Sequence, residues 1–313
     1  MIEDPFGAFA EKWDAELVEL QKTTQSMIHL LPPLEEITVE QMRQGTGSDP
    51  NNPIVKLEMA QERVIPSPSG EIPIRVFVPN EVNGIYFHIH GGGWIAGAQD
   101  MEDPHLWSRA QEASVAVVSV GYRLAPENPY PAGPDDCEAA ALWLIESARK
   151  EFGTDDIVIG GESAGAHLSA VTILRLRDRH QFTGFRGAEL RYGLYDLRLT
   201  PSVRLAPKGM LTAKGVEWLR NHFATAEIHE NPDVSPMFAD LHSMPPALFI
   251  VGSMDSLVDD SLFMWARWRA AGNPAELRIY PGAPHGFDLM ALKVADAAKG
   301  DIATFIKKCL KSS

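Results

Sequence analysis

Short apolar runs alternate with longer segments of helical composition along most of the chain. From the third run onward, helical segments such as residues 135–150, 164–177 and 257–271 separate the runs. Strands that alternate with helices are typical of a parallel sheet covered by helices, so the pattern predicts an α/β fold. The first two runs flank the turn-forming residues 67–70, which favours a hairpin. We predict strands near residues 62–66, 71–79, 84–90, 115–121, 157–161, 188–194, 247–252 and 275–280.

The segment Gly161-Glu162-Ser163-Ala164-Gly165 has the G-x-S-x-G spacing of a nucleophile elbow. A short β-branched run at 156–160 precedes it, and a proline-free helical segment follows it. A strand that turns sharply into a helix at a serine exposes the hydroxyl, provided that the flanking residues are small. The spacing arises by chance in about one such chain in ten, so the flanking strand and helix carry the prediction that Ser163 is a nucleophile.

A second motif, His90-Gly91-Gly92-Gly93-Trp94, follows the apolar run 85–89. The oxyanion of an acyl-transfer intermediate needs backbone N–H donors about 3 Å away, and side chains would block their approach. Such donors come from a glycine-rich loop and from the residue after the nucleophile. Here they would be the loop at 91–93 and Ala164. We interpret His90 as a residue that helps to hold this loop.

A nucleophilic serine needs a base, which in α/β-hydrolases follows the serine and an acid along the chain. Among the histidines after Ser163, only His285 follows a strand-like run, residues 277–280, and it lies in a loop that can project its imidazole over the sheet edge. His167 is one helical turn beyond the serine, and we expect it to point along the helix. The others are expected on the solvated surface: His180, His222, His229 and His242.

Two residues are candidates for the acid that orients this base. Asp255 ends the apolar run 247–254 at a tight turn into a helix, which is the usual position of such an acid, and we favour it. Asp196 closes the preceding strand-like run and is the alternative. Asp259 and Asp260 lie one turn into the helix, where the helix dipole also explains them.

Five segments together resemble the hormone-sensitive-lipase-like esterases, which are the bacterial family IV carboxylesterases of the α/β-hydrolase superfamily. These segments are residues 90–94, 121–127, 161–165, 255–260 and 285–287. The resemblance extends from about Phe87 to Phe287. It implies an α/β-hydrolase fold, in which helices flank an eight-stranded, mostly parallel sheet and a helical cap covers the active site.

The resemblance also implies roles for particular residues. It implies nucleophile, acid and base at Ser163, Asp255 and His285, and oxyanion donors at Gly92, Gly93 and Ala164. Glu162 and Ser256 depart from the family, which more often has Asp and Pro at these positions. We expect the Glu162 side chain to point away from the Ser163 hydroxyl and to hold the elbow by accepting hydrogen bonds near the oxyanion loop or residues 122–123.

Two segments do not fit the sheet. Residues 1–45 show helical spacing from Phe9 to Leu20, and residues 197–245 contain an amphipathic stretch around 216–219. They could simply pack against the core without a role in catalysis, or they could form a cap that lines the acyl pocket and limits the access of water. The resemblance favours the cap. We therefore predict an N-terminal cap segment, 1–45, and a catalytic domain, 46–313, in which 197–245 forms a second cap segment.

The composition excludes several classes of partner. A formal net charge of −14 argues against nucleic-acid and anionic-membrane partners, since both need a basic face.

The cysteines and the start of the chain bear on its location. Cys137 and Cys309 are too few for a disulfide framework. The segment Met1-Ile2-Glu3-Asp4 contains two acidic residues and is not followed by an apolar signal core, and no run approaches the length of a membrane span. We expect a cytoplasmic enzyme without a metal or other cofactor, and leave homodimer formation open.

These observations predict a serine carboxylesterase that acts on small esters of short to medium acyl length. An amidase, lactonase or peptidase with the same triad stays open, because the motifs indicate the reaction class and not the leaving group. A non-catalytic receptor on the same fold is disfavoured by the presence of His285. The pair His88 and His90 suggests a metal-dependent hydrolase, since positions i and i+2 of a strand share one face, but that site would need further ligands.

Overall fold

A computed structural model describes residues 32–45, 54–206, 211–290 and 292–311, together with Lys22 and Ser26. Within these ranges, no helix is both long and apolar enough to cross a membrane. The helical spacing predicted from Phe9 to Leu20 lies outside the described residues.

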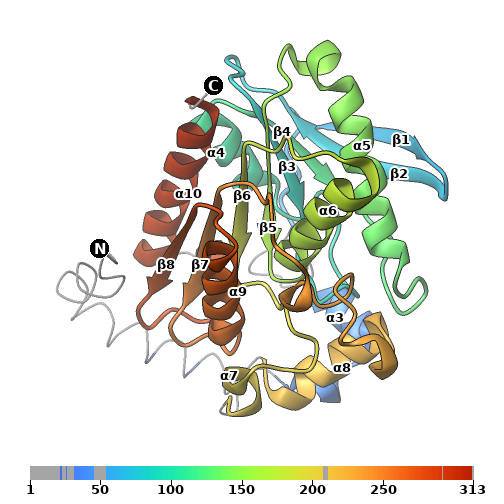
Figure 1. Ribbon diagram of the computed structural model, residues 1–313, viewed down its shortest axis with the longest axis vertical. Coiled ribbons are helices and arrows are strands. Elements are labelled where there is room, and N and C mark those ends of the chain that lie inside the picture. The colour runs from blue at the N-terminus through green and yellow to red at the C-terminus, as the bar shows by residue number, and fades with distance from the viewer. Residues whose placement is uncertain are drawn as a thin grey trace.

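One sheet forms the centre of the molecule, with its eight strands in the order β1-β2-β4-β3-β5-β6-β7-β8 (Figure 1). β2 runs antiparallel to both of its neighbours, and the other pairs are parallel. The predicted hairpin and all the predicted strands are therefore present. The strands are β1 (Gln61–Ser67), β2 (Gly70–Phe77), β3 (Ile85–Ile89), β4 (Ala116–Val120), β5 (Ile157–Glu162), β6 (Gly187–Arg191), β7 (Ala247–Gly252) and β8 (Ala275–Tyr280).

β6 ends earlier than its apolar pattern predicts. The predicted strand reaches residue 194, whereas the observed one ends at Arg191. The next residue, Tyr192, has a φ of 37°, which an extended strand cannot contain. This left-handed residue turns the chain out of the sheet at its carboxyl end.

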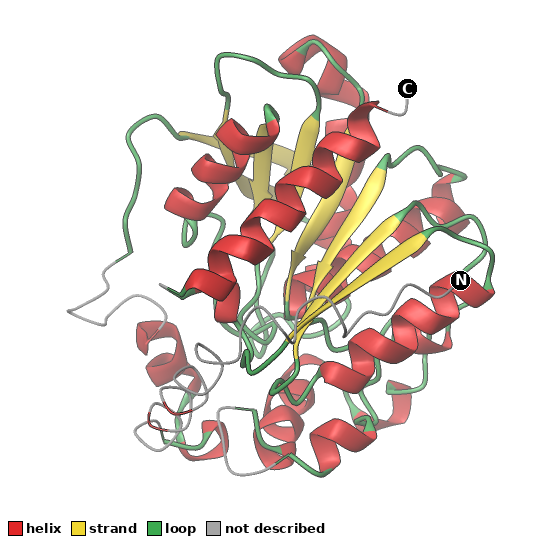
Figure 2. Ribbon diagram, turned by 90° about the vertical axis from the view of Figure 1, so that its left-hand side faces the viewer, coloured by secondary structure: helices red, strands yellow, loops and turns green. Residues whose placement is uncertain are grey.

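Helices cover both faces of the sheet, so the strands from β3 to β7 are buried along their whole length (Figure 2). α4 and α10 pack together on one face, and α5, α6 and α9 cover the other. This double cover explains why the strands are continuous apolar runs and not alternating patterns. The helices are α4 (Asp103–Ala113), α5 (Ala132–Phe152), α6 (Ala164–His180), α9 (Val258–Ala270) and α10 (Lys293–Lys311).

Short helices gather beyond one end of the strands, at the bottom of Figure 1. Among them, α8 packs against η1, and the Thr212 hydroxyl donates to Glu35 over 3.2 Å. The two segments that do not fit the sheet therefore meet, although they are far apart in the sequence. These elements are η1 (Leu34–Glu36), α3 (Val39–Gly45), α7 (Pro201–Arg204), α8 (Ala213–Phe223), η2 (Ala226–Ile228) and η3 (Pro236–Phe238), and η4 (Phe287–Leu289) lies nearer the sheet.

Two glycines, one in β5 and one in α6, allow these elements to approach the end of β3. A Cβ atom built on Gly161 would lie 2.0 Å from the Ile89 carbonyl oxygen, and one on Gly165 would lie 1.9 Å from the same atom. Real Cβ atoms do not come this close to backbone, so neither position accepts a side chain without a shift of β3 or α6. The close packing of these two elements thus depends on the glycines of the motif.

We expect Gly165→Ala to destabilise the fold strongly, because the added methyl group meets a backbone atom that cannot rotate away. Gly300→Ala is the matched control, since a Cβ there meets nothing within 4 Å in the middle of α10. Alanine is preferred to glycine inside a helix by about 1 kcal/mol, so the control should raise the melting temperature slightly. Thermal unfolding of both variants checks this, and equal melting temperatures would contradict the packing argument.

Candidate active site

Ser163 lies at the turn between β5 and α6, where the elbow motif predicts it. Its φ of 55° and ψ of −120° are rare for a residue with a side chain. Such strain persists only where the surroundings determine the backbone, and here the two glycines packed on Ile89 do so. The turn leaves Ser163 partly exposed between two buried elements.

The structure brings Ser163, His285 and Asp255 into one hydrogen-bonded line. His285 Nε2 lies 3.0 Å from Ser163 Oγ, and His285 Nδ1 lies 2.8 Å from Asp255 Oδ2. The other oxygen of Asp255 accepts the backbone N–H of Leu257 at 2.8 Å. The aspartate is buried, and its two bonds fix the carboxylate against the imidazole.

The alternative aspartates bind elsewhere. Asp196 accepts hydrogen bonds from Arg198. Asp260 accepts the backbone N–H groups of Tyr195 and Asp196, and burial raises its pKa to about 7. Asp259 accepts the N–H of Ser202. The geometry therefore associates Asp255, and not Asp196, with His285.

The predicted oxyanion loop faces the serine. Gly93 and Ala164 line the same pocket as Ser163, and Ala164 is the first residue of α6, where a backbone N–H has no acceptor within the helix. Gly92 and Gly93 have φ values of 107° and 60°, which favour glycine. A Cβ atom on Gly92 would lie 2.2 Å from the Ala96 carbonyl oxygen. The loop thus keeps its shape only with glycines.

The pocket at Ser163 is narrow and apolar. Its space, including the part that is open to solvent, is about 280 Å³, and five of its lining residues are apolar, namely Leu194, Leu211, Val216, Leu219 and Leu257. Leu219 projects from α8 toward the glycine loop, because a Cβ atom on Gly93 would lie 2.6 Å from the leucine Cδ2. The pocket suits an apolar group of limited size next to the serine hydroxyl.

Glu162 holds the elbow against the glycine loop, as predicted. Its carboxylate accepts the backbone N–H of Gly91, and it also bonds to His88 Nε2 and Arg191 Nη2, each at 2.9 Å. It has no bond to the segment at 122–123, since the Tyr122 hydroxyl donates to the His90 carbonyl over 3.0 Å. Glu162 therefore links the elbow to the loop itself.

A second carboxyl group, Glu102, is buried against Glu162. Burial, followed by the nearby Glu162 charge, raises the pKa of Glu102 to about 8. Glu162 already accepts three hydrogen bonds, so Glu102 is the member of the pair that keeps the proton. Burial lowers the pKa of His88 to about 3, so its imidazole is neutral. The cluster therefore carries one negative charge, which faces Arg191.

The two histidines of the metal-site hypothesis, His88 and His90, have different partners in the structure. His90 does not join His88, because its ring stacks on Tyr122 with centroids 4.2 Å apart and its Nδ1 bonds to the Gly91 carbonyl over 2.8 Å. Donor atoms of His88, Glu102 and Glu162 do lie within 4.8 Å of one another. The Arg191 guanidinium, however, already supplies positive charge to this carboxylate. These residues fit a carboxyl pair that shares a proton better than they fit a divalent ion.

Arg191 and Asp288 belong to this cluster, although no pattern in the sequence predicted them as site residues. Arg191 Nη1 donates to Asp288 over 2.6 Å, and Asp288 also accepts the Tyr192 hydroxyl over 2.5 Å. The Tyr192 ring packs edge-on against His285, with centroids 4.8 Å apart. The one local signal in the sequence is Arg191 itself, a charged residue inside an apolar strand pattern. Such a pattern does not show which side chains the arginine binds.

Two other histidines are buried, and the prediction for one of them, His229, was wrong. His167 is fully buried: its Nδ1 accepts the Trp94 indole N–H over 3.1 Å, and its Nε2 donates to the Val234 carbonyl over 2.7 Å. His229 was expected on the surface but is buried, with Nε2 3.2 Å from the Ala224 carbonyl oxygen. Carbonyl groups of the segment 197–245 bond to both rings, which a local polar pattern cannot reveal.

A family model described as the alpha/beta hydrolase fold matches residues 86–289, which include the elbow, the glycine loop and the His285 loop. The chain belongs to the α/β-hydrolase fold family. The carboxylic ester hydrolase LipN of Mycobacterium tuberculosis is 34% identical over 71% of this chain. The match spans 62% of the length of LipN.

Two further proteins are similar to this α/β-hydrolase. The ethyl acetate hydrolase of Pseudomonas putida is 30% identical over 73% of this chain and 75% of that protein. The crystal structure of a hormone-sensitive lipase from a metagenome library has a TM-score of 0.80 and 26% identity, over 98% of each chain. The predicted fold and the predicted likeness to hormone-sensitive-lipase-like esterases are confirmed.

The protonated Glu102 should make stability depend on pH. Between pH of about 4.5 and about 8 the folded protein keeps a proton that the unfolded chain has lost, so the free energy of unfolding falls as pH rises through this window. We expect Glu102→Gln, which stays neutral, to reduce this fall. Melting temperatures at pH 5.5 and 8 check it, with the exposed Glu146→Gln as the control. The same pH dependence in all three proteins would contradict the assignment.

Proposed function

We propose that this chain is a serine carboxylesterase that hydrolyses short- to medium-chain esters through an acyl-enzyme intermediate. The observation that carries the proposal is the line of hydrogen bonds from Ser163 through His285 to Asp255, at 3.0 and 2.8 Å. The names of the relatives, carboxylic ester hydrolase and ethyl acetate hydrolase, support the same reaction class.

The mechanism assigns one task to each of the three side chains. Ser163 Oγ attacks the ester carbonyl while His285 Nε2 takes its proton. Asp255 accepts the other ring N–H, which fixes the tautomer and stabilises the imidazolium that forms. His285 then protonates the departing alcohol. Water attacks the acyl-enzyme by the reverse route, and Ser163 regains its proton.

Backbone donors stabilise the negative charge of the tetrahedral intermediate in this proposal. They are the N–H groups of Gly92, Gly93 and Ala164. A donor aimed at a developing oxyanion lowers the barrier by about 3 kcal/mol, because it is oriented before the charge appears. The bond from Gly91 to Glu162 supports this role, since it holds the loop beside the elbow.

We propose that residues 1–45 and 197–245 form the cap of a catalytic domain at 46–313, and that the enzyme is cytoplasmic. The contact between α8 and η1 supports the pairing of the two cap segments. Leu211, Val216 and Leu219, all from the second segment, line the pocket at Ser163. Such a wall excludes water from the reaction and limits the length of the acyl group.

Ser163→Ala and His285→Ala should each reduce the kcat of p-nitrophenyl acetate hydrolysis by about 10⁴-fold or more, because the triad acts as a unit. Asp255→Asn should reduce it by about 10³-fold or more, since asparagine favours the wrong imidazole tautomer. Asp196→Asn is the matched control and should stay within about tenfold of the parent. Circular dichroism verifies folding, and activity of a folded Ser163→Ala protein would reject the proposal.

We expect Leu219 to limit the length of the acyl group that a substrate can carry. We expect the highest kcat/KM for p-nitrophenyl esters below about ten acyl carbons. Leu219→Ala should raise kcat/KM for the longer esters by about tenfold relative to acetate, because each methylene admitted to an apolar pocket contributes about 1 kcal/mol. Leu205→Ala, at a leucine that is 82% exposed, is the control and should leave the profile unchanged.

The same substrate series tests the leaving group. An anilide and a lactone run beside the esters should be turned over more slowly than the best ester. A higher kcat/KM for either one would replace the carboxylesterase proposal with an amidase or a lactonase that uses the same residues.

A further inference from the structure

The proposed oxyanion loop has no side chains of its own to hold it, because residues 91–93 are all glycine. Glycine restricts the backbone less than any other residue, so contacts at the two ends of the loop must set its shape. At one end, the N–H of Gly91 donates to Glu162. At the other end lies Trp94, a buried residue that also lines the pocket at Ser163. The contacts of Trp94 therefore decide the second end of the loop.

Trp94 has a φ of 64°, in the left-handed region that residues with a side chain seldom adopt. Such a conformation persists only where the surroundings determine it. The Trp94 carbonyl accepts the N–H of Ala125 over 3.0 Å, and the indole ring stacks on Phe223 of α8 with centroids 4.7 Å apart. The indole N–H donates to His167 Nδ1 over 3.1 Å. Because an indole has a single N–H, this bond fixes how the stacked ring is turned.

The two partners of His167 allow only one form of its ring. The indole of Trp94 can only donate, so Nδ1 must be the acceptor. The carbonyl of Val234 can only accept, so Nε2, which lies 2.7 Å away, must carry the proton. His167 is fully buried, and burial lowers its pKa to about 4, which keeps the ring neutral. Both bonds are therefore present together at neutral pH.

His167 connects the two parts of the proposed oxyanion site. Its own backbone N–H donates to the Ser163 carbonyl over 3.1 Å, so His167 lies at the start of α6. The N–H of Ala164, at the beginning of the same helix, is the third proposed donor. A bond from this part of the helix to Trp94 restrains the distance between the helix and the loop that carries Gly93.

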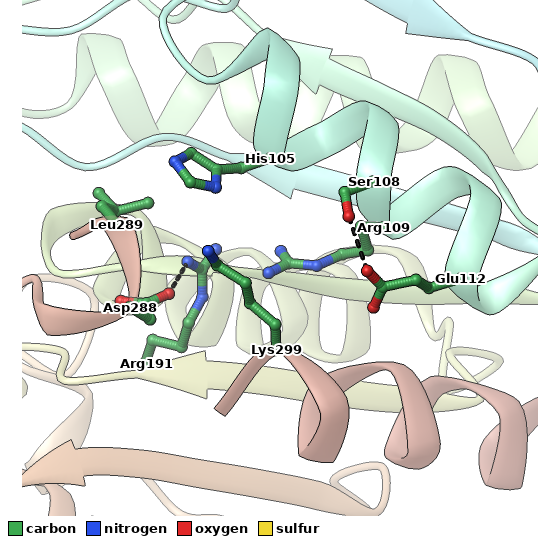
Figure 3. Close-up of a pocket in the computed structure, with 8 residues that line it drawn as sticks. All are labelled: His105, Ser108, Arg109, Glu112, Arg191, Asp288, Leu289 and Lys299. Atoms are coloured by element: carbon green, nitrogen blue, oxygen red, sulfur yellow. Dashed lines mark hydrogen bonds and ion pairs between the residues drawn. The ribbon is translucent and has the colours of Figure 1, made fainter. Parts of the chain in front are cut away.

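Glu162 and His167 hold the loop from opposite sides of Ser163 in the sequence. Glu162 belongs to a charged cluster, because it binds Arg191, and the bond from Arg191 to Asp288 is drawn in Figure 3. The two hydrogen-bond partners of the His167 ring are uncharged. A change at His167 therefore affects the second end of the loop and leaves the bonds of Glu162 in place.

We propose that His167 is a positioning residue for ester hydrolysis, which holds Trp94 so that the N–H of Gly93 stays aimed at the oxyanion. The proposal rests on the proposed esterase function. His167 acts through Trp94 and does not line the pocket at Ser163. A displaced donor stabilises the transition state less but changes the binding of the neutral ester little. Loss of this bond should thus lower kcat more than it raises KM.

Two variants separate the two bonds of His167. The amide oxygen of asparagine is as many bonds from Cα as Nδ1 is, so His167→Asn can still accept from Trp94. The amide nitrogen of glutamine corresponds in the same way to Nε2, so His167→Gln keeps the bond to Val234 and loses the acceptor for Trp94.

With p-nitrophenyl acetate, we expect the kcat of His167→Gln to fall by about 10–100-fold, with KM within about threefold of the parent. The kcat of His167→Asn should stay within about threefold. Equal losses of kcat in the two variants would show that the ring has only a packing role and would overturn the proposal.

Ile173→Val is the matched control, at a buried residue further along α6. The small cavity that it leaves should lower the melting temperature slightly, as the His167 variants should, while kcat stays within about twofold. Circular dichroism measures the melting temperatures and verifies that each variant folds. A fall in kcat of Ile173→Val as large as that of His167→Gln would reject the proposal, since any buried defect in the helix would then have the same effect.

Trp94→Phe tests the same bond from its other partner and decides the question if His167→Gln does not fold. Phenylalanine keeps a ring to stack on Phe223 but has no N–H. We expect a similar fall in kcat, with no further fall in the double variant, because both changes remove one bond. Losses that multiply, or a parent-like kcat in Trp94→Phe, would contradict the proposal. A parent without esterase activity would instead reject the proposed function, and the role of His167 with it.

Discussion

The buried Glu162 carboxylate is the group around which the active-site end of the sheet is arranged. It follows the last apolar residues of β5 and immediately precedes Ser163, so its position is tied to the elbow. A buried carboxylate is tolerated only when several donors reach it, and here Gly91, His88 and Arg191 do so. The same bonds that satisfy Glu162 fix the glycine loop at a constant distance from the serine.

Arg191 carries this arrangement across the sheet to the His285 loop. It bonds to Glu162 on one side and to Asp288 on the other, and Asp288 holds the hydroxyl of Tyr192, whose ring packs on His285. Elbow, glycine loop and histidine loop come from different parts of the chain. One charged cluster inside the protein orients all three, and its low-dielectric surroundings strengthen each bond.

The opposite side of Ser163 is apolar. Leu211, Val216 and Leu219 of the segment 197–245 line the pocket at the serine, and Leu219 lies against Gly93 of the glycine loop. The polar network therefore holds the elbow and the two loops in place, while the segment 197–245 lines the pocket at Ser163. Because the two sets of side chains are separate, substitutions in the segment 197–245 can change this pocket without loss of the hydrogen bonds below the elbow.

The sequence by itself determined the features that depend on neighbouring residues. Runs of β-branched residues predict the strands, and the glycines around Ser163 and after His90 predict turns that only small residues allow. The elbow, the glycine loop and the loop of His285 were found in this way. The early end of β6 escaped prediction because the left-handed Tyr192 is a residue type that strands favour.

Only the tertiary structure decided which charged groups meet. Asp255 and Asp196 both close strand-like runs, and although the turn after Asp255 favoured it, the contact itself forms because the fold brings Asp255 to His285, 30 positions along the chain. Glu162 and Arg191 are 29 positions apart, and Arg191 and Asp288 are 97 apart. Hydrophobic periodicity shows which face of an element is buried, but pairing of buried charges depends on how distant elements pack. A single sequence contains no local trace of that packing.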